Sequence, residues 1–168
     1  MQLTDFILEA LEREHDALLK EVQDLTPTEL AKRIGPEANP IGWMLWHMLR
    51  VEDMWIQFFA QKQPELWESQ GWAKQLNLPL RDYGFGHTQA QVAAFPTLPL
   101  GTLLAYFEAV RASTIAYLKS LPPEAYDVVP RERRPDMTIG SMFRQIVNEL
   151  NQHLGQIAYI RGVLRSQP

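Results

Sequence analysis

Helical periodicity dominates this 168-residue chain and restricts its fold more than any other feature. In four long segments, apolar residues recur at intervals of three, four and seven, which places them on one face of an α-helix. No segment alternates apolar and polar residues for long enough to predict a strand. The sequence therefore predicts a single all-α domain, residues 1–168, folded as a four-helix bundle. The four expected helices cover residues 4–25, 40–61, 102–120 and 138–164.

The predicted helix boundaries follow from residues that cap helices or open them. Thr4 and Thr138 are the expected N-caps of the first and fourth long helices, and Asn39-Pro40 opens the second. A capping box between Thr26 and Glu29, with proline at the first helical position, predicts one or two additional turns after the first helix.

Residues 62–101 show no sustained period and predict a long crossover connection between the second and third helices. A short helix with Thr88 as its N-cap is expected inside it. Connections of this length in a compact domain are usually functional or join distant helix ends. Several aromatic residues indicate that this one packs down as a cover: Trp67, Trp72, Tyr83 and Phe85.

The second long helix carries apolar residues on almost every side and is predicted to be the most buried. Its tryptophans are expected to fill the core. His47 lies about 60° from the centre of the expected core face on a helical projection. That face consists of Met44, Val51, Trp55 and Phe58.

Composition and charge exclude several classes of protein. The chain has no cysteine, which rules out disulfides, thiolate ligands and a cysteine nucleophile, so any nucleophile is a bound thiol, water or a hydroxyl. A net charge of −4 with scattered basic residues argues against nucleic-acid binding. The chain shows neither a signal peptide nor a membrane span, so a cytoplasmic protein with no membrane partner is expected.

Two polar residues interrupt the apolar face of the last predicted helix. Glu149 and His153 lie one turn apart between Ile146 and Ile157. An unpaired buried carboxylate costs several kcal/mol, so Glu149 must protonate, pair or bind a cation. Side chains at positions i and i+4 can both reach one ion, although a structural Glu–His pair satisfies the same pattern.

A catalytic divalent metal commonly keeps three protein ligands and an open position for water or substrate. His47, seven residues into the most buried helix, is the preferred third ligand. His15 is the second candidate, with a half-buried place at the edge of the first helix as the alternative. His87, in the irregular segment, is the third candidate and could cover the site without ligating.

Charged residues elsewhere are expected to be solvated or paired. Arg50 and Arg161 could reach an anionic substrate, but solvated or paired roles are favoured. The mixed-charge run at residues 131–134 is interpreted as a solvated turn.

The segments "NPIGWMLWHMLRVEDMW" and "NELNQHLGQIAYIRGVL" resemble the DinB-like family of four-helix bundles, which includes bacterial damage-inducible proteins and thiol-dependent transferases. The resemblance covers nearly the whole chain through W-x-x-W-H in the second helix and H-x-G-Q-x-x-Y-x-R-G in the last. It implies a divalent metal held by His47, His153 and the residue at Glu149. That middle ligand is usually histidine in the family, and the two-His, one-carboxylate set here suits zinc, nickel, iron or manganese.

The resemblance also implies an activity. Family members with assigned chemistry resemble transferases or isomerases that use a low-molecular-weight thiol such as bacillithiol, mycothiol or glutathione. We therefore expect a small-molecule electrophile as substrate and a homodimer as the assembly. Glu52 and Asp53 are candidates for a general base, with solvent-facing roles favoured, so no catalytic residue is assigned. The alternatives are a non-catalytic helical protein with a vestigial metal site and a metal-dependent hydrolase.

Overall fold

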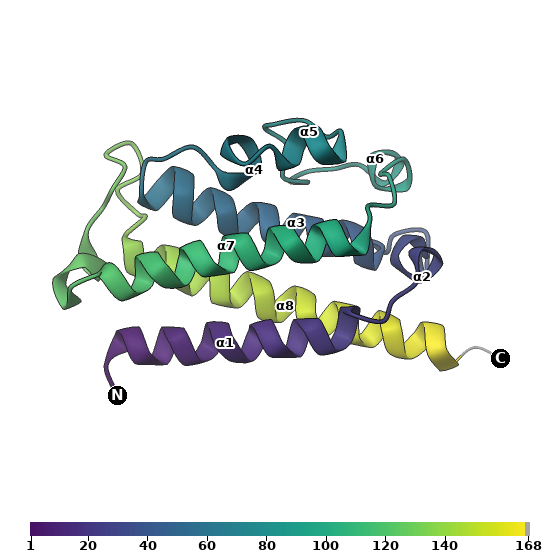
Figure 1. The fold of residues 1–168 in the computed structure, drawn as a ribbon, viewed down its shortest axis with the longest axis horizontal. Helices are drawn as coiled ribbons and strands as arrows, with labels where there is room; N and C mark the ends of the chain where they lie inside the picture. Colours follow the sequence, from purple (N-terminus) through teal and green to yellow (C-terminus); the bar gives the residue numbers. More distant parts are fainter. Residues whose placement is uncertain (167–168) are drawn as a thin grey trace.

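The computed structural model describes residues 1–166, and its regular elements over that range are all helices. Four long helices lie side by side (Figure 1). Helix α1 packs against α8, and α3 packs against both α7 and α8. The all-α prediction is confirmed. The long helices are α1 (Leu3–Val22), α3 (Ile41–Asp53), α7 (Leu100–Ser120) and α8 (Ile139–Ser166).

Shorter helices join the long ones. A π-helical stretch, Met54–Ala60, continues α3, and a 3₁₀ turn, Pro123–Asp127, lies between α7 and α8. The predicted crossover segment contains α6 with Thr88 as its N-cap, as expected, and two short helices that were not predicted. Over residues 1–166, the short α-helices are α2 (Pro27–Ala31), α4 (Leu66–Ser69), α5 (Trp72–Leu76) and α6 (Gln89–Ala93), of which α4 and α5 were not predicted.

Two further predicted caps, besides Thr88, are present. The backbone N–H of Thr26 donates to Glu29 Oε2 at 2.8 Å, and the N–H of Glu29 donates to Thr26 Oγ1 at 3.2 Å. The N–H of Ser141 likewise donates to Thr138 Oγ1 at 3.1 Å at the start of α8. These hydroxyls satisfy backbone donors that lack a partner within the helix.

Two other boundaries were predicted wrongly by a residue or two. Helix α1 starts before Thr4, and the carboxylate of Asp5 accepts from the N–H of Gln2 at 3.1 Å. The hydroxyl of Thr4 instead lies 2.6 Å from the hydroxyl of Tyr126, a tertiary contact that local sequence does not reveal. Helix α3 has Pro40 itself as its N-cap and therefore starts one residue later than expected.

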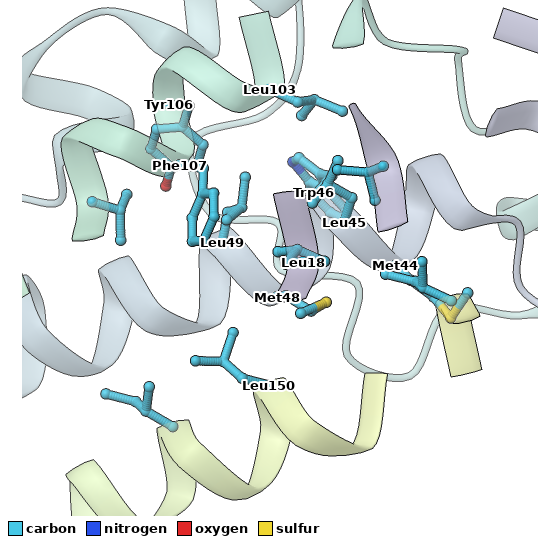
Figure 2. Close-up of a cluster of buried hydrophobic side chains, with 14 of the residues drawn as sticks. Leu18, Met44, Leu45, Trp46, Met48, Leu49, Leu103, Tyr106, Phe107 and Leu150 are labelled. Atoms are coloured by element: carbon cyan, nitrogen blue, oxygen red, sulfur yellow. The ribbon is translucent and has the colours of Figure 1, made fainter. Parts of the chain in front are cut away.

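All four long helices contribute to the hydrophobic core (Figure 2). Leu18 of α1, Phe107 of α7 and Leu150 of α8 surround α3. Every residue of α3 is buried, which confirms that it is the central helix, and Trp43 and Trp46 fill the core as expected.

The prediction that the core face of the second helix extends to Phe58 is wrong. Phe58 is 39% exposed, because the π-helical turn adds a residue per turn and rotates the positions that follow. The Arg131 guanidinium lies 4.6 Å from the centre of the Phe58 ring and bonds to the Phe58 carbonyl. Arg131 is therefore packed against the protein, whereas the rest of the predicted solvated turn, residues 132–134, is exposed.

Among residues 1–166, the structure has no helix that is both long enough and apolar enough to cross a lipid bilayer.

Candidate metal centre

The structure brings three of the predicted site residues together where α3 packs against α8. His47 lies in the first half of α3, and Glu149 and His153 are one turn apart on α8. Their side chains are 6%, 15% and 12% exposed, respectively. The group is therefore almost buried, with its carboxylate the most accessible member.

One carboxylate oxygen lies between the two imidazoles. Oε1 of Glu149 is 3.1 Å from Nε2 of His47 and 3.0 Å from Nε2 of His153. The two rings are 5.2 Å apart and almost perpendicular. One potential ligand atom from each residue lies within 4.8 Å of the others, so the three could share one ion.

The outer nitrogens of both imidazoles are already engaged. Nδ1 of His47 hydrogen-bonds to the backbone carbonyl of Tyr83, and Nδ1 of His153 lies 2.7 Å from Oε1 of Gln156. A carbonyl oxygen can only accept, so each Nδ1 carries the proton. Each Nε2 then either carries a second proton or points a lone pair at the carboxylate. The arrangement therefore requires positive charge at its centre.

The electrostatics of the site agree with this requirement. Hydrogen bonds from His153 and His47 lower the pKa of Glu149 to about 2, so this residue stays ionised. Desolvation opposes protonation of His153, but its bonds to Glu149 and Gln156 outweigh that and raise its pKa. A divalent cation can replace the imidazole protons, and second acceptors on both Nδ1 atoms are typical of metal-binding histidines. The donor set fits a divalent metal.

Trp43 of α3 and two residues from the segment between α3 and α7 surround the His47 ring. Trp43 stacks on the His47 ring at 5.0 Å, and Phe85 meets its edge at 5.2 Å. Gly84 has φ +82°, and a Cβ there would lie 2.6 Å from Cζ2 of Trp43 and 3.2 Å from Nδ1 of His47. Only glycine fits this conformation and this space.

The other two histidines lie outside the group. His87 accepts from Trp43 Nε1 at 3.2 Å and bonds to Asp82 at 3.0 Å. It therefore contacts the site through Trp43, and neither of its ring nitrogens bonds to Glu149. His15 is half-buried and lies 2.8 Å from Glu108. It therefore takes the half-buried position that was the alternative to its being a metal ligand.

The solvent-facing roles expected for Glu52 and Asp53 are wrong. Glu52 is 1% exposed, and both of its oxygens accept from Arg111, at 3.1 and 2.9 Å. Asp53 is fully buried and accepts from the Tyr106 hydroxyl at 2.7 Å. Both carboxylates are occupied by partners from α7, so neither is available as a general base.

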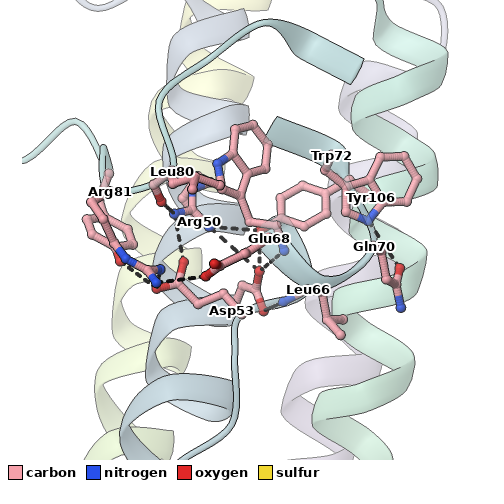
Figure 3. Close-up of polar contacts among 12 residues, drawn as sticks. Arg50, Asp53, Leu66, Glu68, Gln70, Trp72, Leu80, Arg81 and Tyr106 are labelled. Carbon is pink, nitrogen blue, oxygen red and sulfur yellow. Dashed lines mark hydrogen bonds and ion pairs between the residues drawn. The ribbon is translucent and has the colours of Figure 1, made fainter. Parts of the chain in front are cut away.

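Both arginines considered as substrate contacts are paired instead. Arg50 is fully buried and lies 2.7 Å from Glu65 and 3.6 Å from Asp53 (Figure 3). Arg161 pairs with Glu21 and Asp24, both at 3.1 Å. The interpretation of paired arginines is correct for both.

A model of the DinB superfamily matches residues 10–157, most of the chain and all three candidate ligands. The chain belongs to the DinB superfamily. The structure of this DinB superfamily protein is similar to a crystal structure described as a conserved protein of locus from Enterococcus faecalis. The TM-score is 0.86 and the sequence identity 25%, over 99% of each chain. A search of curated proteins finds no match.

Proposed function

We propose that this DinB superfamily protein is a divalent-metal-dependent enzyme that transfers a low-molecular-weight thiol to an electrophilic small molecule. The observation that carries the proposal is the convergence of two imidazole Nε2 atoms on one carboxylate oxygen while both Nδ1 atoms are held by acceptors. The superfamily match supports the same interpretation.

His47, Glu149 and His153 would hold the ion, and two histidines with one carboxylate suit zinc, nickel, iron or manganese. When bound, such an ion lowers the pKa of a thiol or water in its open position, which makes a nucleophile available at neutral pH. The chain has no cysteine, so the thiol belongs to a cosubstrate.

We place the electrophile in a cavity of about 250 Å³ that is connected to the candidate ligand His153 through Gln156. Gln156 lines this cavity and also bonds to His153, while Met44 lines it one turn before His47. Tyr159, which is 68% exposed, also lines it. These residues would bind and orient a small, partly apolar substrate next to the ligands.

Three further parts of the interpretation are proposals of the same kind. We interpret the four long helices as a four-helix bundle in one domain, with the segment between α3 and α7 as its crossover. A homodimer stays a prediction, and so does a cytoplasmic location. No residue beyond the three candidate ligands is assigned a catalytic role.

Metal content tests the first step. Protein purified without chelator and supplied in turn with each of the four metals is expected to contain one ion per chain by elemental analysis. His47→Ala, Glu149→Gln and His153→Ala should lose it. His15→Ala is the matched control, because His15 also pairs with a carboxylate but lies outside the site. Wild-type protein that takes up none of the four metals would favour the structural Glu–His pair.

Thiol conjugation tests the second step. The loaded protein is expected to accelerate consumption of an aryl halide by bacillithiol, mycothiol or glutathione, and the three ligand variants should not. Activity with an ester but with none of the thiols would favour the hydrolase alternative.

A further inference from the structure

Tyr83 contacts the candidate metal centre and a second polar cluster at the same time. Its backbone carbonyl accepts from Nδ1 of His47, and its hydroxyl donates to Oε1 of Glu65 at 2.5 Å. Burial, together with the Glu65 carboxylate, raises the pKa of Tyr83, so the hydroxyl keeps its proton and acts as the donor. The carbonyl oxygen that accepts from His47 therefore belongs to a residue whose side chain is anchored by Glu65.

Arg50 holds the segment around Tyr83 in place. The Arg50 guanidinium donates to the carbonyl of Leu80 at 3.0 Å and to the carbonyl of Asp82 at 3.3 Å, and lies 4.6 Å from the centre of the Tyr83 ring. It also pairs with Glu65 at 2.7 Å. Arg50 stands one turn after His47 on α3, so one rigid helix presents both the ring and the group that anchors its hydrogen-bond acceptor.

Residues 79–87 lie between α5 and α6, outside any helix, so side-chain contacts hold the segment in place. The Trp67 indole donates to the Pro79 carbonyl at 3.0 Å at one end, and His87 bonds to Trp43 and Asp82 at the other. Tyr83 itself is anchored by its hydroxyl and by the Arg50 guanidinium. Removal of one of these anchors should therefore loosen the Tyr83 carbonyl.

We propose that Tyr83 is a positioning residue for His47, and that Glu65 and Arg50 hold it so that the carbonyl keeps the proton on Nδ1 and turns Nε2 toward the metal. This inference rests on the proposed metal site. Second partners of ligating histidines typically contribute 10- to 100-fold to metal affinity. The crossover segment is then part of the metal centre, although none of its residues is a ligand.

The test compares Tyr83→Phe with wild type by two measurements. The variant keeps the ring on Arg50 and removes only the hydroxyl that reaches Glu65. Zinc affinity, measured by competition with a chelating dye, is expected to fall about 10-fold. In ¹⁵N NMR of the metal-free protein, the Nδ1–H signal of His47, assigned by its absence in His47→Ala, is expected to exchange faster with water. Unfolding in urea and the circular dichroism spectrum show that each variant is folded.

Two matched controls separate this role from general loosening. Tyr159→Phe removes the hydroxyl of an exposed tyrosine and should change neither measurement. Glu65→Gln should weaken zinc binding, whereas Glu68→Gln should not, because Glu68 pairs with Arg81 at the exposed edge of the same cluster. The second pair tests the anchor even if Tyr83→Phe fails to fold.

The possible outcomes are distinct. Zinc affinity or Nδ1–H exchange in Tyr83→Phe equal to wild type overturns the positioning role, and so does equal weakening by Glu68→Gln. If wild type binds none of zinc, nickel, iron or manganese, the proposed function fails. The Nδ1–H exchange of His47 then decides by itself whether Tyr83 holds the ring.

Discussion

The buried and nearly buried carboxylates on or against α3 form two groups, which differ in the kind of side chain that neutralises them. Glu52 lies against Arg111, and Asp53 and Glu65 lie against Arg50, so each has a guanidinium within 3.6 Å. Glu149 lies instead between two imidazoles. An arginine is charged at any pH at which the protein folds, whereas a histidine is charged only when protonated.

The difference separates a structural site from a chemical one. The arginine-paired carboxylates need no further cation, because each has a permanently charged partner, and Glu52 accepts from Arg111 through both of its oxygens. The histidine-paired carboxylate is complete only when protons or a cation occupy the space between its partners. A site that can exchange protons for a metal can bind and release an ion, and the arginine-paired carboxylates cannot.

The largest effect is expected on breaking an arginine pair. Arg111→Leu leaves Glu52 buried without a partner and should lower the free energy of unfolding by about 3–5 kcal/mol, measured by urea denaturation. The double variant Arg111→Leu/Glu52→Leu should recover most of the loss, because an apolar pair of similar volume needs no counter-charge. Equal stability of the single and double variants would show that the unpaired charge of Glu52 is not what destabilises Arg111→Leu. The contrast between carboxylates paired with arginine and with histidine would then be wrong.

Zinc should stabilise the histidine-paired site alone. At a free zinc concentration 100 times the dissociation constant, the free energy of unfolding of wild type should rise by about 2.7 kcal/mol. His47→Ala should show no such rise, and Arg161→Ala, which removes a surface ion pair, should show the full one. Urea denaturation with and without zinc measures both. A rise in His47→Ala as large as in wild type would place the zinc elsewhere.

The sequence predicted the long helices well because their apolar spacing is local. The third long helix was expected at residues 102–120 and runs over Leu100–Ser120. The short helix α4 was missed because its start depends on a tertiary contact: the backbone N–H groups of Leu66 and Trp67 donate to the Asp53 carboxylate at 2.9 and 2.8 Å. A cap supplied from another helix leaves no local signal.

The candidate site likewise has a part that sequence patterns predicted and a part that depends on contacts between distant residues. The spacing of Glu149 and His153 places both on one face of α8. The place of His47 in the most buried predicted helix made it the preferred third ligand, and the family resemblance implied the same residue. Arg111, the partner of Glu52, and Tyr106, one of the partners of Asp53, come from α7, more than 50 residues away, so sequence spacing gave no reason for either carboxylate to be buried. Tyr83 contributes a backbone carbonyl to the site, and a backbone atom cannot be recognised from residue type.

Gly84 offers a smaller test of the histidine-paired site. Gly84→Ala places a Cβ 2.6 Å from Trp43 and 3.2 Å from His47, so it should lower the free energy of unfolding by about 1–3 kcal/mol and weaken zinc binding. Gly71→Ala is the control, because Gly71 also has a positive φ but has no atom within 4 Å of the added Cβ. Gly71→Ala should therefore show the backbone cost with unchanged zinc affinity. Equal zinc affinity in both variants would separate Gly84 from the His47 site.

Glu14 is neutralised in a third way, and its effect is the smallest when it is measured over a single pH unit. It is 6% exposed and accepts from Asn151, and its Oε2 has no hydrogen-bond partner in the described part of the chain. Desolvation raises its pKa to about 8, against the attraction of Arg111 and with the repulsion of Glu52. Glu14 thus stays protonated in the folded protein at neutral pH, while the unfolded chain ionises near its ordinary value of 4.5.

The folded state then binds one more proton than the unfolded state between these two pKa values. The free energy of unfolding should therefore fall as pH rises from about 4.5 to about 8, by at most about 1.4 kcal/mol per pH unit from this group. Glu14→Gln, a neutral isostere, should remove that part of the slope, whereas Glu9→Gln on the exposed face of the same helix should not. Urea denaturation at several pH values, with chelator present, measures it. An unchanged slope in Glu14→Gln would mean that Glu14 is ionised in the folded protein and that Arg111 neutralises it too. The expected result would instead show that Glu14 is buried by protonation, whereas Glu52 is buried by a permanent ion pair and Glu149 beside the exchangeable cation that we propose.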